Sequence, residues 1–286
     1  MSRGLRKYLA SPGASLGTAI VLLAAACALL ASQLAAQNPF NLAEISVADS
    51  QLPPGGIGIT GMSYWLGTDD QGRDVYSAIL YGLRISLGVA LVSTAIAFVL
   101  GTSIGLMAAY FGGWSEILLM RLADIQLAFP GLLIALVLLA VLGSGLDKVV
   151  LAIVAVQWAY YARTARSAAL IERSKEYILA ARNLRFSALR IMLVHLLPNS
   201  MAALSVVVVV QMAGAIALEA TLSFLGVGLP ITQPSLGLLI ANGYSSMLSG
   251  EYWLSFYPGF VLLLVLVGIN LVGERLRALN DPRDLA

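Results

Sequence analysis

The sequence predicts an all-α integral membrane protein with six transmembrane helices. Of its 286 residues, 59% are hydrophobic and only 11% are charged, against roughly 25% charged in a typical soluble domain. The charged residues divide the chain into six long uncharged runs, and none of the runs shows the period-two alternation of a barrel strand. Because backbone polar groups cannot stay unpaired in lipid, these runs can cross a membrane only as helices.

Five of the six runs contain the roughly 20 apolar residues needed to cross a hydrocarbon core about 30 Å thick. The runs are residues 8–43, 85–115, 125–146, 149–162, 191–218 and 252–273. The fourth run spans only about 21 Å as a helix, so it must extend through residues 160–166. Arg163 and Arg166 can reach the interface there with their long side chains.

Glycine and proline mark the expected ends of these helices. Gly112 and Gly113 separate the second helix from the third, Pro130 lies early in the third, and residues 143–145 form a short outer turn. Pro198 lies near the start of the fifth helix, where its missing amide hydrogen costs little.

Arginine and lysine placement predicts cytoplasmic N- and C-termini. With that orientation, only Arg73, Arg84 and Lys148 lie outside. The inside carries Arg3, Arg6, Lys7, Arg121, Arg163, Arg166, Arg173, Lys175, Arg182, Arg185, Arg190, Arg275, Arg277 and Arg283. The net charge of +2 therefore reports orientation, and we expect no nucleic-acid partner.

We expect a cytoplasmic tail at residues 1–14 and one transmembrane domain over residues 15–286. Its longer connections are an outer loop at residues 37–83, a cytoplasmic loop at residues 163–190 and an outer segment at residues 226–251. An alternative for the N-terminus is a lipoprotein signal ending at Cys27, the single cysteine. The apolar run continues past Cys27 and exceeds the length of a signal core, which favours a retained first helix.

The cytoplasmic loop is strongly basic and predicts a helix over residues 172–184, a break at residues 185–187 and a resumption that leads into the fifth transmembrane helix. Charge alone leaves two interpretations open. The loop is either a helix resting on anionic headgroups or an element that presents one side to a soluble partner.

Residues 176–182, Glu-Tyr-Ile-Leu-Ala-Ala-Arg, and residues 195–199, His-Leu-Leu-Pro-Asn, favour the second interpretation. This pattern resembles the docking loop of ABC importer permeases of the dipeptide, oligopeptide and nickel branch. The resemblance implies a type I importer permease fold whose first short loop helix, the coupling helix, fits into a groove on an ATPase. The residues that it assigns to ATPase coupling are Glu172, Lys175, Glu176, Tyr177, Ala180, Ala181, Arg182, Arg185, His195, Pro198 and Asn199.

Within this pattern, small Ala180 and Ala181 would allow a partner to approach closely, and Glu176 could pair with its charges. Arg185 departs from the family, which has glycine at this turn. Arginine adopts a positive φ only at a steric cost, so the turn geometry is open. His195 is the only histidine; besides its place in the motif, it can be a capping or packing residue.

A second stretch similar to that branch precedes the second helix and comprises Gly67, Thr68, Asp69, Asp70, Gly72, Arg73 and Asp74. Its acids suggest calcium, but their spacing misses the calcium-loop pattern. We expect Asp70, Arg73 and Asp74 to form an ion-paired scaffold at the outer face, which the family places near the binding-protein contact.

Two further stretches match the branch: residues 120–124 with Phe129 and Pro130, and residues 222–228 after Glu219. An ionisable residue such as Glu219 at membrane depth is a candidate functional residue. It is either at an outer gate or permease interface, or an interfacial carboxylate that water reaches. Arg121 and Asp124, three apart on a helix, are expected to pair.

The chain has no Gly-Lys-Ser/Thr phosphate loop, so we predict a non-catalytic subunit that binds no cofactor, with ATP and magnesium used by partner ATPases. By resemblance, the partners are a second homologous permease, two ATPase subunits, an extracytoplasmic substrate-binding protein and membrane lipid, in a bacterial inner membrane. Peptides are the first choice of substrate, with nickel complexes, glutathione and opine-like or sugar conjugates as others. An ion-gradient-driven secondary transporter and a membrane scaffold are the alternative functions.

Overall fold

The computed structural model describes residues 8, 11–41, 44–59, 61–230 and 232–279. The predicted inner cations Arg3, Arg6, Lys7 and Arg283 lie outside these residues. Helices dominate, and the elements in chain order are α2 (Pro12–Leu29), α3 (Ala31–Leu34), η1 (Val47–Asp49), β1 (Gly56–Ile57), β2 (Ser63–Tyr64), α4 (Val75–Phe111), α5 (Gly113–Leu127), α6 (Gly131–Leu142), α7 (Leu146–Arg173), α8 (Glu176–Asn183), α9 (Ala188–Arg190), η2 (Ile191–Leu196), α10 (Leu197–Phe224), α11 (Leu236–Ser246), η3 (Met247–Ser249) and α12 (Trp253–Leu279).

Among the described residues, four helical segments are long and apolar enough to cross a membrane: α2, α4, the continuous stretch Ala188–Phe224, and α12. The pair α5 and α6 would make a fifth span if it is counted as one, but the two are bent by 90°. At 28 residues, α7 is long enough, yet charged residues lie near both of its ends. A count of six spans is therefore still a prediction.

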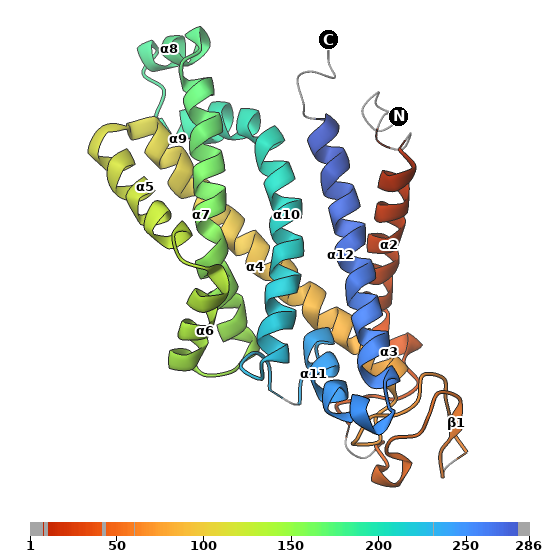
Figure 1. Cartoon of the computed structure of the whole chain (residues 1–286). Coiled ribbons are helices and arrows are strands. Elements are labelled where there is room, and N and C mark those ends of the chain that lie inside the picture. Colours follow the sequence, from red (N-terminus) through yellow and green to blue (C-terminus); the bar gives the residue numbers. More distant parts are fainter. Residues whose placement is uncertain (1–7, 9–10, 42–43, 60, 231, 280–286) are drawn as a thin grey trace.

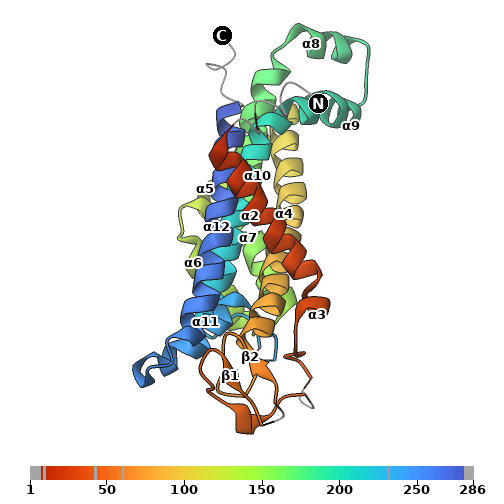
Figure 2. The same cartoon turned by 90° about the vertical axis from the view of Figure 1, so that its right-hand side faces the viewer.

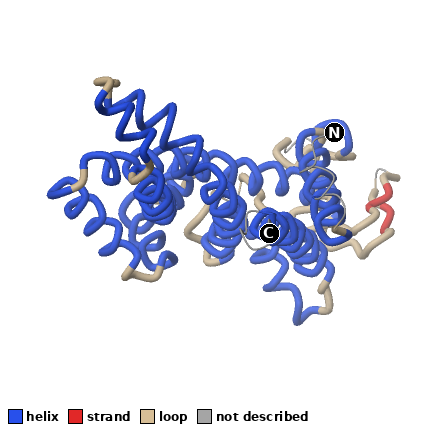
Figure 3. Tube along the Cα trace, turned by 90° about the horizontal axis from the view of Figure 1, so that it is seen from above, coloured by secondary structure: helices blue, strands red, loops and turns tan. Residues whose placement is uncertain are grey.

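α4 packs along α7, and α10, α12 and α2 pack alongside (Figure 1). Seen from above, the molecule is almost entirely helical, with the short sheet at one edge (Figure 3). α4 and α7 approach very closely because small residues line their contact. An added Cβ on Gly101 would lie 2.2 Å from the Trp158 carbonyl oxygen, and one on Gly105 would lie 2.3 Å from that of Ala162. This is the small-xxx-small pattern by which membrane helices bring their backbones together.

The start of α2, the end of α12 and helix α8 lie at one end of the molecule, and β1, β2, α3 and α11 lie at the other (Figures 1 and 2). The strands β1 and β2 form a two-stranded antiparallel sheet. The expected helix breaks at Gly112 and at residues 143–145 are confirmed.

The structure corrects three predicted boundaries. The third helix is not continuous, because Pro130 cannot donate an amide hydrogen and the chain turns sharply between α5 and α6. The outer loop ends at Asp74 instead of Leu83, since Asp74 accepts a 3.0 Å bond from the Ser77 amide and caps α4. The outer segment at residues 226–251 contains a further helix, α11, capped by Ser235.

Pro198 lies near the start of α10, as predicted. α10 continues a helical stretch that begins at Ala188. The preceding turn, η2, is π-helical. A π-helical turn is common where the regular hydrogen bonds between residues i and i−4 of a helix are interrupted.

Candidate functional site: the α8 loop, the outer scaffold and Glu219

The loop between α7 and α10 folds as a short helix held against the end of the bundle. α8 begins at Glu176, four residues later than predicted, because Glu172 and Arg173 still belong to α7. Ile178 and Ala181 point inward and join a buried apolar cluster with Leu106, Ala109, Ala169, Ile191, Met192 and Leu196. This packing connects α8 to α4, α7 and η2.

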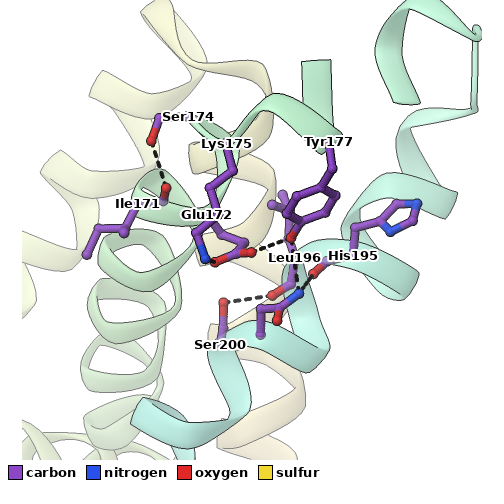
Figure 4. Close-up of polar contacts among 9 residues, drawn as sticks. Ile171, Glu172, Ser174, Lys175, Tyr177, His195, Leu196 and Ser200 are labelled. Carbon is purple, nitrogen blue, oxygen red and sulfur yellow. Dashed lines mark hydrogen bonds and ion pairs between the residues drawn. The ribbon is translucent and has the colours of Figure 1, made fainter. Parts of the chain in front are cut away.

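Polar contacts add a second link between α8 and its neighbours (Figure 4). The Tyr177 hydroxyl donates to Glu172, whose other carboxylate oxygen lies 2.7 Å from the Lys175 ammonium. The Asn199 amide donates to the Tyr177 hydroxyl at 3.2 Å and to the His195 carbonyl at 2.7 Å. One connected set of side chains therefore joins α7, α8 and the start of α10.

Charge and burial change the titration of this cluster. The hydrogen bonds from Lys175 and Tyr177 lower the pKa of Glu172, and burial together with the bond to Glu172 raises the pKa of Tyr177 to about 12. At neutral pH the pair is thus a carboxylate and a protonated phenol. The favourable contribution of Glu172 is present above its unfolded pKa and is lost as the pH falls through its lowered folded value.

His195 packs between two aromatic rings. Its ring is parallel to that of Phe186, with centroids 6.3 Å apart, and edge-on to that of Tyr177 at 6.0 Å. On the other side of the loop, the Arg182 guanidinium lies 4.9 Å from the Tyr110 ring centre, and Arg173 donates 2.6 Å to the Ala109 carbonyl. These contacts favour the packing interpretation of His195 and fasten the loop to the end of α4.

The outward side of α8 is different in character. Glu176, Leu179, Ala180 and Asn183 are exposed along one helical face. Ala180 is therefore available to a partner, as expected, but Ala181 is buried at 5% exposure and does not face outward. Sequence analysis did not single out Leu179. The signal that could have found it is a large apolar side chain between the polar residues Glu176 and Asn183 on this face.

The chain leaves α8 through a Schellman turn that contains Arg185. The Phe186 amide donates to the Ala181 carbonyl and the Arg185 amide to that of Arg182, at 3.1 and 2.9 Å. Arg185 has φ +55°, the left-handed conformation that glycine adopts without strain. The turn therefore keeps the geometry that a glycine would take, with arginine in its place.

We expect Arg185→Gly to stabilise this turn by about 0.5 to 1 kcal/mol, since relief of the left-handed backbone outweighs the added chain entropy of glycine. Hydrogen exchange of the α8 amides should slow in the variant. Asn183→Gly is the matched control, because Asn183 is exposed and helical and its replacement should speed exchange. Unchanged or faster exchange in Arg185→Gly would contradict the expectation.

The outer stretch is a hydrogen-bonded scaffold. Thr68, Asp69, Arg73 and Asp74 are buried, whereas Asp70 is exposed. The Asp69 carboxylate accepts bonds from the Gln71 and Arg73 amides at 2.9 and 2.8 Å, and burial raises its pKa. Gly67 and Gly72 take positive φ angles.

The expected ion pairing of this scaffold is wrong. The ion pairs of the described residues join Arg163 to Asp124, Arg166 to Glu116 and Lys175 to Glu172, and none lies in residues 67–74. The Asp69 and Asp74 carboxylates accept hydrogen bonds from backbone amides instead, and the Arg73 guanidinium donates to Gln71. The predicted pairing of Arg121 with Asp124 is likewise wrong, because α7 brings Arg163 to Asp124 instead.

Gln37, which sequence analysis did not single out, fastens the scaffold to the end of α3. Its side-chain oxygen accepts a 2.8 Å bond from the Asp74 backbone amide, and its backbone amide donates to the Ser77 hydroxyl at 3.2 Å. No sequence motif marks this glutamine.

Glu219 is completely buried, with 0% of its surface exposed, so it is not a water-exposed interfacial carboxylate within this chain. Its two carboxylate oxygens accept 2.7 Å bonds from Ser86 of α4 and Ser223 of α10. The Ser86 hydroxyl also accepts a 3.3 Å bond from the Leu236 amide. This Glu219 junction therefore joins α4, α10 and the start of α11.

Comparisons with known proteins give a family match and several relatives. Residues 101–284 match the family described as "Binding-protein-dependent transport system inner membrane component". The dipeptide transport system permease protein DppC of Alkalihalophilus pseudofirmus is 35% identical over 97% of this chain and 87% of that protein. The di/tripeptide transport system permease protein DppC of Pseudomonas aeruginosa is 36% identical over 95% of this chain and 88% of that protein.

A glutathione transport system permease protein, GsiD of Pectobacterium atrosepticum, is 34% identical over 77% of this chain and 73% of that protein. Among solved structures, a chain of the MetNI methionine ABC transporter in an inward-facing conformation has a similar fold. Its TM-score is 0.56 at 17% identity, over 71% of this chain and 96% of that one.

Proposed function

Because the chain belongs to the family of inner membrane components of binding-protein-dependent transport systems, we propose that it is the peptide-importing permease subunit of a bacterial ABC transporter. It is a non-catalytic membrane component of such an importer. In the proposal it crosses the bacterial inner membrane six times, with α7 as the sixth span. It forms the translocation pathway with a second, homologous permease.

The observation that carries the proposal is the placement of α8. This helix protrudes at the end where α2 starts and α12 ends (Figure 2). The excess of arginine and lysine in the loops of that end supports a cytoplasmic location. An ATPase subunit would contact the outward face formed by Glu176, Leu179 and Ala180.

The inward side of α8 supports a role in coupling. The apolar cluster around Ile178 and the polar contacts of Tyr177 attach α8 to α4, α7 and α10. A displacement of α8 by a partner is therefore passed to three membrane helices, instead of being absorbed by a flexible loop. ATP binding elsewhere would bias two arrangements of these helices and expose the pathway to alternate sides.

Two further partners complete the proposed importer. The outer scaffold of residues 67–74 lies at the opposite end of the molecule from α8 and would face an extracytoplasmic binding protein. Peptides are the proposed substrates, because relatives over nearly the whole chain are named dipeptide or di/tripeptide permeases.

The decisive experiment is peptide uptake by proteoliposomes that contain the chain, its sister permease, ATPases and binding protein. We expect uptake to require ATP on the side of the membrane that carries the ATPases. Uptake should continue when an ionophore collapses the ion gradients. Uptake abolished by the ionophore in the presence of ATP would favour a secondary transporter. A complex that assembles but transports nothing would favour a scaffold.

Within this assay, Ala180→Trp should reduce ATP-driven uptake roughly tenfold, equivalent to about 1.4 kcal/mol of lost coupling, because the indole blocks close approach to the outward face of α8. Ala95→Trp is the matched control, since Ala95 is exposed on α4 about three turns before Leu106, where α4 first contacts the cluster that holds α8. Membrane insertion should be normal in both variants. Full activity of Ala180→Trp would show that the outward face of α8 is not the contact with the ATPase.

A further inference from the structure

One face of the molecule carries an open groove with a mixed apolar and charged lining, between α5, α7, α10 and α12. It consists of two adjoining clefts of about 790 and 680 Å³ that share Arg163 and Thr164. Asp124 lies on the α5 side, and Tyr160, Gln211 and Arg277 continue the groove. The volume of each cleft is in the range that holds a small-molecule ligand.

The groove differs from the lipid-facing sides of this chain because charged residues contribute to its lining. The exposed residues of α4 that flank Ser103 are apolar, as suits lipid. An arginine on a spanning helix is costly unless it faces water or a partner charge. Because Asp124 meets only part of the Arg163 guanidinium, water or a polar partner must also reach this side of the chain.

The two arginines of α7 near this groove differ in how many hydrogen bonds their guanidinium groups make. Arg166 donates through Nε and Nη2 to the Glu116 carboxylate. Arg163 makes a single 3.3 Å contact with Asp124, and 60% of its side chain is exposed. Within the described residues no other partner is found for Arg163, so most of its five donors point into open space.

We propose that Arg163 is a substrate-contact residue, whose guanidinium binds the carboxylate of a peptide as it passes along the groove; this inference rests on the proposed function. Guanidinium matches carboxylate in shape and charge, and every peptide with a free C-terminus carries that group. Asp124 holds Arg163 when the groove is empty, and the weak, one-point pair is readily exchanged for the substrate.

The charges around Arg163 support an anionic ligand. Glu116 neutralises Arg166, and Asp124 neutralises at most one of the two remaining lining arginines, Arg163 and Arg277. The groove thus keeps one positive charge in excess. Tyr160 and Gln211 supply neutral hydrogen-bonding groups beside it, which suit the peptide bond of a ligand.

The first test compares two variants that break the same ion pair in the reconstituted transporter. Arg163→Gln should lower the maximal rate of dipeptide uptake roughly tenfold, with an unchanged KM, since capture is done by the binding protein. Asp124→Asn, which frees Arg163, should retain uptake. Equal losses in both variants would mean that the pair is a structural strut, and normal uptake in Arg163→Gln would remove Arg163 from the path; either result overturns the inference.

The second test needs no transport. In a Cys27→Ser background, which removes the single native thiol, Thr164→Cys is treated in the detergent-solubilised complex with anionic and cationic methanethiosulfonates. Relative to the intrinsic rates of the two reagents, the ratio of the anionic to the cationic rate should be raised about tenfold, because a unit charge about 6 Å away in water changes each rate about threefold in opposite directions. Arg163→Gln should abolish that preference. A cysteine that neither reagent reaches, or a preference unaffected by Arg163→Gln, would overturn the inference.

These outcomes separate the inference from the proposed function. If the wild-type complex transports peptides with ATP while the Arg163 variants behave as wild type, only the inference fails. If the wild-type complex transports no peptide, the proposed function fails, and the thiol reactivity still reports whether Arg163 gives the groove its positive character.

Discussion

Gly105→Val is expected to destabilise the protein by about 3 kcal/mol, at the upper end of the usual cost of overpacking. A Cβ at this position would lie 2.3 Å from the Ala162 carbonyl oxygen and 2.8 Å from the Ala165 Cβ, and real atoms do not approach so closely. Neither obstacle is the end of a flexible side chain, so α4 and α7 must separate. The loss should appear as a lower midpoint of thermal unfolding in detergent and a lower yield of folded protein.

Gly88→Val on the same helix is the matched control. No atom lies within 4 Å of the Cβ that would be added at Gly88, so the change in helix propensity is the same but the clash is absent. The control should remain close to wild type. Equal stability of the two variants would show that the contact between α4 and α7 tolerates expansion.

Glu219→Ala is expected to destabilise the protein by a similar amount, about 3 kcal/mol, because it removes the acceptor of two buried hydrogen bonds. The Ser86 and Ser223 hydroxyls would lose their acceptor in a place that water does not reach. Since Ser86 also holds the start of α11, hydrogen exchange of residues 236–246 should rise together with the fall in thermal stability.

Two companion variants give this expectation its contrast. Glu219→Gln keeps one acceptor oxygen and should lose less stability than Glu219→Ala. Glu274→Ala removes an exposed carboxylate from α12 and should change little. Protection of α11 that is unchanged in Glu219→Ala would show that the junction does not hold this helix in place.

Patterns local in the chain predicted much of the fold. Long uncharged runs predicted the apolar helices, paired glycines predicted the end of α4, and the loop motif predicted a short helix with a break after residue 184. At Arg185 the sequence left the geometry of the turn open, and the structure shows the positive φ of a glycine position, +55°. Each of these features depends on residues that are close in sequence.

The features that sequence analysis missed depend on residues far apart in the chain. Periodicity cannot show that Asp124 meets Arg163 instead of Arg121, since this depends on how α5 lies against α7. Nor can it show which alanine of a pair is buried, as with Ala180 and Ala181. Pro130 signalled an interruption, but the 90° angle follows from the packing of α6 on α7.

The same limit applies to the candidate sites. Acidic and basic residues near one another suggested ion pairs in residues 67–74, yet the backbone supplied the partners. Glu219 was recognised because an ionisable residue in an apolar run is rare. Its partner Ser86 lies on another helix, and nothing in the sequence marks Ser223 as its other partner. Buried hydroxyl donors carry no sequence signal of their own.

The hydrogen bonds of Gln37 have a consequence for how the outer loop between α3 and α4 can vary. Its side chain and backbone hold both ends of the connection between α3 and α4, through Asp74 and Ser77. The residues in between therefore form a closed ring, and its length does not set the spacing between the two helices. A chimera that carries a longer or shorter ring should keep this spacing if it preserves the close approach of Gly67 to Trp253 of α12.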